Sequence, residues 1–137
     1  VGNTFGATVF SSYGAFWISF ALIISPWSGV AAAYKTDIEF SRAIGFFLLG
    51  WLIFTLVVFA ASLRSSFTLS LTIFWLIFAF TFLTAGAFIP TMPVLHKVGG
   101  YFGLLTAFTG WYTMAAGLLT LETSYFVVPV GDMSRRK

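Results

Sequence analysis

The chain has 137 residues, of which 59% are hydrophobic, 20% are aromatic and only 8% are charged. A soluble domain carries about 25% charged residues, so this composition excludes an ordinary soluble protein and indicates a protein embedded in a lipid bilayer. The chain has no cysteine and a single histidine, His96, which excludes a disulfide framework and a metal site built from cysteine or several histidines.

Four stretches are apolar enough to cross a membrane as helices, which needs about 20 residues each. They are residues 4–24, 43–62, 67–89 and 99–121. Transmembrane strands would need about 10 residues of alternating pattern, and the continuous run GFFLLGWLIFTLVVFAA does not alternate. We therefore predict an all-α integral membrane fold, with a single transmembrane domain over residues 1–137 and a C-terminal tail at residues 122–137.

The first predicted span, FGATVFSSYGAFWISFA, keeps several hydroxyl groups in an apolar run, although an unpartnered hydroxyl is costly in hydrocarbon. A helical wheel separates two faces. One is a small, polar stripe made of Thr4, Thr8, Ser11, Ala15 and Ser19. The opposite face holds Tyr13 with Gly2, Gly6, Val9 and Phe20. Spacing alone does not decide which face meets a substrate and which packs against another helix.

The charged residues lie at the ends of the predicted spans. If the first span starts on one side of the membrane, that side collects Arg64, Arg135, Arg136 and Lys137. The other side collects Lys35, Arg42 and Lys97. The slightly larger basic group favours a cytoplasmic C-terminus by the positive-inside rule. No Asp, Glu, Lys or Arg falls in the middle of a span, which argues against a strongly charged pathway and for a small or partly neutral substrate.

The last predicted span carries small and hydroxyl residues at helical spacing. The stripe consists of Thr106, Thr109, Thr113, Gly117 and Thr120, and Gly99 and Gly103 extend it as a GxxxG pair. Such residues commonly hold membrane helices together, and they are also suited to the wall of a pore. Both interpretations are open from the sequence.

Three segments carry a resemblance to a known family. They are GNTFGATVFSSYGAFWISFA at residues 2–21, RAIGFFLLGWLIFTLVVFAASLRSS at residues 42–66, and SYFVVPVGDMS at residues 124–134. They resemble the acetate uptake transporter family, which includes bacterial succinate–acetate permeases and fungal acetate and ammonia-export proteins. The resemblance covers essentially the whole chain and is strongest to the fungal members.

The resemblance implies a six-span bundle, of which the four spans seen here would be spans 3–6. Family members begin with an NPxPLGL-type motif at the first span, and no such motif is present, so a C-terminal fragment is expected. The chain starts at Val1 with no visible signal peptide. The resemblance also implies a homo-oligomer, a hexamer, in the plasma membrane, with a cytoplasmic C-terminus.

The function that the resemblance implies is a transporter or channel for acetate and similar small monocarboxylates. We expect transport to be linked to protons, because a bare carboxylate is costly to desolvate. By motif position, the tyrosine of the family's narrow constriction is Tyr13 and its leucine is Leu76. The constriction's third member, a phenylalanine of the first span, has no counterpart in this sequence. Ordinary packing is the alternative role for Tyr13 and Leu76. Asn3 and Thr4 are candidate donors at the substrate mouth, and helix capping is their alternative role.

Two other functions are kept open. One is ammonia or ammonium export, for which aromatic rings would provide a cation site. The other is a non-transporting membrane protein that senses acetate. The sequence holds no Ser-His-Asp set, phosphate-binding loop or metal cluster, so we expect no enzyme activity, no cofactor, no metal and no nucleic-acid partner. The expected partners are the small carboxylate, the lipid bilayer and further copies of the chain.

Overall fold

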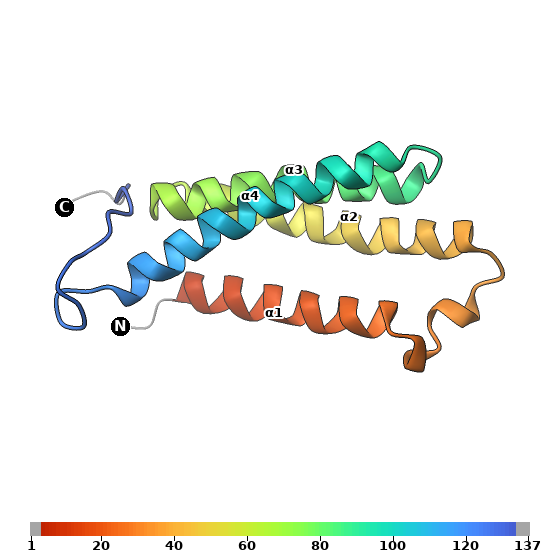
Figure 1. Cartoon of the computed structure of the whole chain (residues 1–137), viewed down its shortest axis with the longest axis horizontal. Coiled ribbons are helices and arrows are strands. Elements are labelled where there is room, and N and C mark those ends of the chain that lie inside the picture. The colour runs from red at the N-terminus through yellow and green to blue at the C-terminus, as the bar shows by residue number, and fades with distance from the viewer. Residues whose placement is uncertain (1–3, 134–137) are drawn as a thin grey trace.

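Four long helices run up and down alongside one another in a computed structural model that describes residues 4–133 (Figure 1). They are α1 (Thr4–Ile24), α2 (Asp37–Ser62), α3 (Phe67–Phe88) and α4 (Pro93–Leu118). Two short 3-10 helices, η1 (Pro26–Ser28) and η2 (Ala31–Ala33), lie between α1 and α2. Within residues 4–133 the backbone forms no strand, apart from an isolated bridge between Ser66 and Asp132. The predicted all-α fold is confirmed.

The helices α1 and α2 differ in how closely they follow the apolar windows. The bounds of α1 coincide with the expected ones, and Pro26 follows directly after the helix and Ser25. Helix α2 begins earlier than residue 43, because Thr36 caps it by accepting a hydrogen bond from the Glu39 amide at 3.2 Å. Asp37 and Glu39 lie in the first turn, where the helix dipole favours negative charge.

The bounds of α4 differ from the window 99–121 at both ends. The helix begins at Pro93, because proline has no amide hydrogen and its fixed φ is suited to the first turn of a helix. It ends at Leu118, where the hydroxyl of Thr123 donates a hydrogen bond to the last helical carbonyl at 2.7 Å. The Leu118 carbonyl has no amide donor from a further helical turn, and the Thr123 hydroxyl takes the place of that donor. Helix α3 ends at Phe88 rather than at residue 89.

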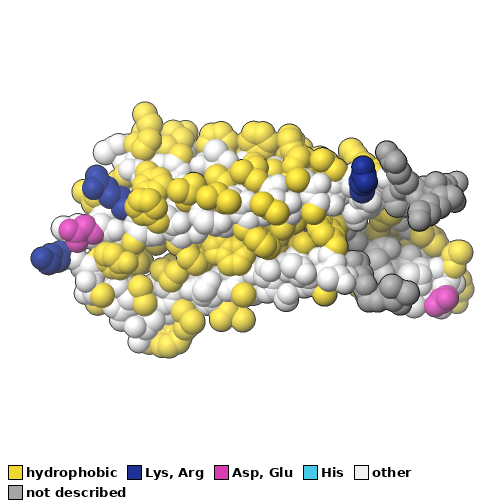
Figure 2. Space-filling view, turned by 180° about the vertical axis from the view of Figure 1, so that it is seen from behind, with side chains coloured by type: hydrophobic (Ala, Val, Ile, Leu, Met, Phe, Trp, Pro, Cys, Tyr) yellow, Lys and Arg dark blue, Asp and Glu magenta, His cyan; other side chains and the backbone are white. Residues whose placement is uncertain are grey.

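By length and composition, α1, α2 and α3 can each cross a membrane, whereas α4 does not reach the same apolar content within the described chain. Helix α4 is long enough, with 26 residues, but glycine, threonine, tyrosine and tryptophan dilute its aliphatic residues. Figure 2 shows apolar side chains along the length of one face, with charged side chains toward the two ends. That distribution is expected of a membrane protein. That α4 spans the membrane stays a prediction.

Glycines and serines hold α2, α3 and α4 close together. A Cβ at Gly45 would lie 3.0 Å from the Phe88 ring, and a Cβ at Gly99 would lie 2.8 Å from Leu83 Cγ. At the tight turn between α2 and α3, the buried Ser70 hydroxyl donates to the Ser62 carbonyl at 2.9 Å. Small residues permit this close approach of the helix backbones. Such packing matters in a membrane, because lipid supplies no hydrophobic force to press helices together.

Helix α1 joins the other helices through two buried clusters. We call Val9, Val58 and Ile73 the Val9 cluster, and Phe16, Leu48 and Phe80 the Phe16 cluster. Each combines side chains from α1, α2 and α3, and the Phe16 and Phe80 rings meet edge to face at 5.3 Å between centroids. The contact between α1 and the remaining helices is therefore made largely by bulky side chains.

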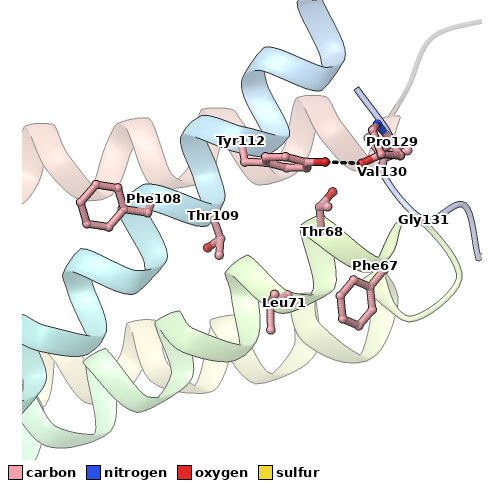
Figure 3. Close-up of a pocket in the computed structure, with 9 residues that line it drawn as sticks. All are labelled: Phe67, Thr68, Leu71, Phe108, Thr109, Tyr112, Pro129, Val130 and Gly131. Carbon is pink, nitrogen blue, oxygen red and sulfur yellow. Dashed lines mark hydrogen bonds between the residues drawn. The ribbon is translucent and has the colours of Figure 1, made fainter. Parts of the chain in front are cut away.

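The C-terminal segment folds back over the start of α3. The amide of Phe67 donates to the Gly131 carbonyl at 2.8 Å, and the amide of Met133 donates to the Ser65 carbonyl at 3.0 Å. The Tyr112 hydroxyl donates to the Pro129 carbonyl at 2.8 Å, drawn as a dashed line in Figure 3. A cavity of about 430 Å³ lies between this segment, α3 and α4. The segment thus caps a helix end whose amides have no partner within the helix.

Candidate functional site

Tyr13 and Thr55 form a hydrogen-bonded pair between α1 and α2. The phenol of Tyr13 donates to Oγ1 of Thr55 at 2.9 Å, and the Thr55 hydroxyl donates to the Trp51 carbonyl at 2.7 Å. Thr55 is completely buried, with 0% of its surface exposed. The pair is therefore a polar point inside an apolar bundle, and the phenol has already used its only hydrogen.

Aromatic rings surround the Tyr13 phenol. The Phe54 ring meets it edge to face at 5.8 Å between centroids, and the Trp51 ring lies at 6.1 Å. Tyr13 packs against both the Val9 cluster and the Phe16 cluster. The face of α1 that holds Tyr13 is consequently the face buried against the other helices, and Gly6 and Val9 are buried on it.

Leu76 of α3 packs against the same Phe16 cluster as Tyr13. The structure thus brings the two sequence-predicted constriction residues, which lie on different helices, to one apolar cluster. An arrangement of a leucine and a phenol around buried rings is able to exclude water from a narrow path. Their roles as a constriction stay a prediction.

An open groove of about 560 Å³ begins at this cluster and is lined by all four long helices. Helices α1 and α2 contribute Phe16, Trp17, Phe20, Ile44 and Leu48. Helix α3 contributes Leu76, Ala79, Phe80 and Leu83, and α4 contributes His96, Gly100, Gly103, Leu104, Thr106 and Ala107. The wall is almost entirely apolar, as ligand-binding clefts commonly are, with a few polar groups at defined points.

The structure describes one of the two predicted mouth residues, Thr4. Asn3 lies outside the described residues. Thr4 is exposed at the start of α1, and its carbonyl accepts a hydrogen bond from the Thr8 hydroxyl at 2.8 Å. Their roles as substrate donors stay predictions.

The hydroxyl groups of α1 bond to the backbone of their own helix. Ser11 donates to the Ala7 carbonyl at 2.6 Å and Ser19 donates to the Ala15 carbonyl at 2.9 Å. This back-bonding satisfies a hydroxyl in an apolar setting without a neighbouring helix. It explains how an apolar helix accommodates these hydroxyl residues, with Thr8 and Ser11 on an exposed face.

The threonine stripe of α4 divides between two roles. The hydroxyl oxygen of Thr113 lies 3.5 Å from that of Thr72 on α3, which is a helix contact. Thr106 lines the groove, and Thr109 lines the cavity beneath the C-terminal segment. The stripe is therefore neither wholly packing surface nor wholly cavity wall.

Thr55 is the site residue that sequence reasoning missed. It is the only hydroxyl residue between Ser41 and Ser62 in an otherwise apolar run, and that isolation is the feature by which it can be recognised. Its partner Tyr13 is 42 residues away, so the pairing depends on the fold. Across residues 4–133 no group of three or more His, Cys, Asp or Glu side chains is placed to hold a metal ion.

Long apolar helices, charges at their ends and an apolar groove define a helical membrane protein. Residues 1–135 match the family described as the GPR1/FUN34/yaaH family. The chain belongs to this family.

Three proteins to which the chain is similar are named for the transport of acetate or ammonia. Acetate permease A of Emericella nidulans is 41% identical over 95% of this chain and 47% of its own length. Ammonia transport outward protein 2 of Saccharomyces cerevisiae is 37% identical over 92% of this chain and 45% of its own length. The solved structure of the bacterial acetate channel SatP matches with a TM-score of 0.78 and 30% identity, covering 95% of this chain and 69% of that one. The chain thus spans less than half the length of these two fungal relatives.

Proposed function

We propose that this chain forms part of a membrane transporter or channel for acetate and similar small monocarboxylates, and that the path passes Tyr13 and Leu76. The similarity to an acetate permease and to an acetate channel supports the substrate class. The hydrogen bond from Tyr13 to Thr55 beside the Phe16 cluster is the observation that carries the proposed mechanism.

The direction of that hydrogen bond favours a neutral acid over an anion. Because the Tyr13 hydrogen is given to Thr55, the phenol oxygen offers lone pairs rather than a donor. A protonated carboxylic acid can donate its own hydrogen to those lone pairs, whereas a carboxylate has no hydrogen to donate. Desolvating a carboxylate in an apolar site is also far more costly than desolvating the acid. Proton-linked movement follows from both arguments.

The remaining features of the proposal come from the family resemblance. The four helices would be spans 3–6 of a six-span subunit, assembled as a homo-hexamer in the plasma membrane with a cytoplasmic C-terminus. No covalent chemistry and no enzyme activity is proposed. In this orientation the end of the bundle that carries the turn between α3 and α4 faces outward, opposite the C-terminal segment (Figure 1).

The test is uptake of labelled acetate by the full-length protein in liposomes, with and without an inward proton gradient. We expect the gradient to stimulate uptake, and we expect Tyr13→Ala to admit larger carboxylic acids because it removes the phenol from the constriction. Tyr101→Ala is the matched control, because Tyr101 is a tyrosine of α4 with 67% of its surface exposed. An oligomer that inserts correctly but carries no acetate would refute the proposal, and acetate binding without flux would point to the sensing alternative.

Ammonia or ammonium is the second candidate solute. The similarity to an ammonia transport outward protein favours it, as do the Trp51 and Phe54 rings beside Tyr13, since ring faces attract cations. The same liposomes loaded with labelled methylammonium separate the two candidates. Efflux of methylammonium without acetate uptake would replace the carboxylate proposal with this one.

A further inference from the structure

His96 lines the groove at the end of the bundle opposite the C-terminal segment. It lies in the first turns of α4, which begins at Pro93, and its ring packs against Gly86 near the end of α3. A Cβ atom at position 86 would lie 2.5 Å from Nδ1 and 2.7 Å from Cε1 of the imidazole. The missing side chain of Gly86 is therefore what allows the imidazole to occupy this position.

Among the described residues that line the groove, only His96 has a side chain that can carry a charge. The other described lining residues whose side chains carry a polar atom are Trp17 and Thr106. The Thr106 hydroxyl already donates to the Phe102 carbonyl at 2.9 Å. An anion that enters the groove consequently finds one group able to neutralise it, and Leu76 lies farther along the same wall.

We propose that His96 binds the incoming carboxylate at the mouth of the groove and gives it the proton with which it crosses. This inference rests on the function proposed above and names the residue that links transport to protons. In the step, an N–H bond of the imidazolium breaks and an O–H bond forms on the carboxylate, leaving a neutral imidazole and a neutral acid. The imidazole then regains a proton from the water outside, so no other reactant is needed.

Imidazole is suited to this exchange, because histidine is the side chain that ordinarily changes charge between about pH 5 and 8. The neighbouring elements bring few other charges. Helices α1 and α3 contain no Asp, Glu, Lys or Arg. Lys97 follows His96 on α4, and α2 begins at the same end of the bundle with Asp37, Glu39 and Arg42.

The deciding experiment compares His96→Gln with Lys97→Gln in the full-length protein, reconstituted in liposomes and assayed with labelled acetate from about pH 5 to 8. Glutamine keeps a hydrogen-bonding side chain but does not exchange a proton. For His96→Gln we expect the KM for acetate near pH 6 to rise about tenfold and the pH dependence to flatten. For Lys97→Gln, which removes an adjacent positive charge, we expect the pH profile to keep its shape.

A second pair of variants tests the geometry rather than the charge. Gly86→Ala should displace the imidazole and raise the KM in the same direction, whereas Gly50→Ala on α2, which does not line the groove, should not, because a Cβ there meets nothing within 4 Å. Size-exclusion profiles check that each variant assembles. If Gly86→Ala fails to assemble, the comparison of His96→Gln with the wild type decides alone. Wild-type uptake with an unchanged His96→Gln profile, or equal flattening in Lys97→Gln, would overturn the role of His96. Absence of wild-type uptake would instead overturn the proposed function.

Discussion

The phenol of Tyr13 and the hydroxyl of Thr55 lie 42 residues apart in the chain and form a hydrogen bond of 2.9 Å between α1 and α2. Among the described residues, α1 packs against α2 and α3 mainly through the apolar side chains of the Val9 and Phe16 clusters. A directional bond between two buried polar groups specifies a position in a way that apolar packing does not. This pair therefore sets the register of the helix that carries the proposed constriction.

Tyr13→Phe tests the strength of this bond. The variant keeps the ring contacts with Trp51 and Phe54 and removes only the donor. The Thr55 hydroxyl keeps its own bond to the Trp51 carbonyl, so we expect a loss of about 0.5–1 kcal/mol, as found for hydrogen bonds between membrane helices. The measurement is the midpoint of thermal unfolding in detergent, with the exposed Tyr101→Phe as control. Equal midpoints for the two variants would contradict the prediction.

Two isosteric changes should have different effects on stability. Thr55→Val leaves the Tyr13 phenol without its acceptor and should cost about 1–3 kcal/mol. Thr84 is buried with 6% exposure, and within the described chain its hydroxyl has no hydrogen-bond partner. Thr84→Val removes a buried polar atom that makes no hydrogen bond, so the substitution should be neutral or stabilising by about 1 kcal/mol. Chemical denaturation of both variants in one detergent gives the comparison, and destabilisation by Thr84→Val would show that its hydroxyl has a partner.

The sequence predicted the helices well because apolar length and proline positions are local properties. Ser25 and Pro26 follow directly after the end of α1, as their dihedral preferences require. Helix α2 begins at Asp37, before the predicted span at residues 43–62, because the apolar window does not include the capped polar turn that precedes it. Capping by Thr36 is a local pattern too, so that boundary was predictable in principle.

The contents of the site were predictable only in part. The helical wheel of α1 separated the Tyr13 face from the hydroxyl stripe, and the structure buries Gly6 and Val9 on the Tyr13 side. The sequence pattern did not identify Thr55 or place His96 in the groove, because both positions depend on residues brought together from other helices. A periodic pattern identifies a face, but the partner of that face depends on the three-dimensional packing.

The two glycines of the GxxxG pair in α4 should respond differently to alanine. A Cβ at Gly99 would lie 2.8 Å from Leu83 Cγ and 3.1 Å from the Leu83 backbone nitrogen, and the backbone cannot move aside cheaply. We expect Gly99→Ala to cost about 1–3 kcal/mol by forcing α3 and α4 apart. Gly103→Ala meets nothing within 4 Å and should be neutral or gain up to about 1 kcal/mol from helix propensity. Unfolding midpoints measure both, and equal losses would mean that Gly103 contacts a segment outside the described residues.

The docking of the C-terminal segment should depend on Gly131. Its φ of 63° lies in the left-handed region, and a Cβ there would lie 2.9 Å from the Phe67 Cβ. Gly131→Ala should therefore weaken the bonds that the amides of Phe67 and Thr68 donate to the Gly131 and Val130 carbonyls.

Hydrogen exchange of the first turn of α3 measures this release. We expect exchange at these two amides to rise about tenfold for each 1.4 kcal/mol lost from docking, while amides in the middle of α3 stay protected. Gly29→Ala is the matched control, because Gly29 has a φ of 70° but a Cβ there meets nothing within 4 Å. It carries the same backbone strain at the opposite end of the bundle, so it should leave the exchange of Phe67 and Thr68 unchanged. If both variants raised that exchange equally, the effect would come from general destabilisation, and the segment would not be held by the contact between Gly131 and Phe67.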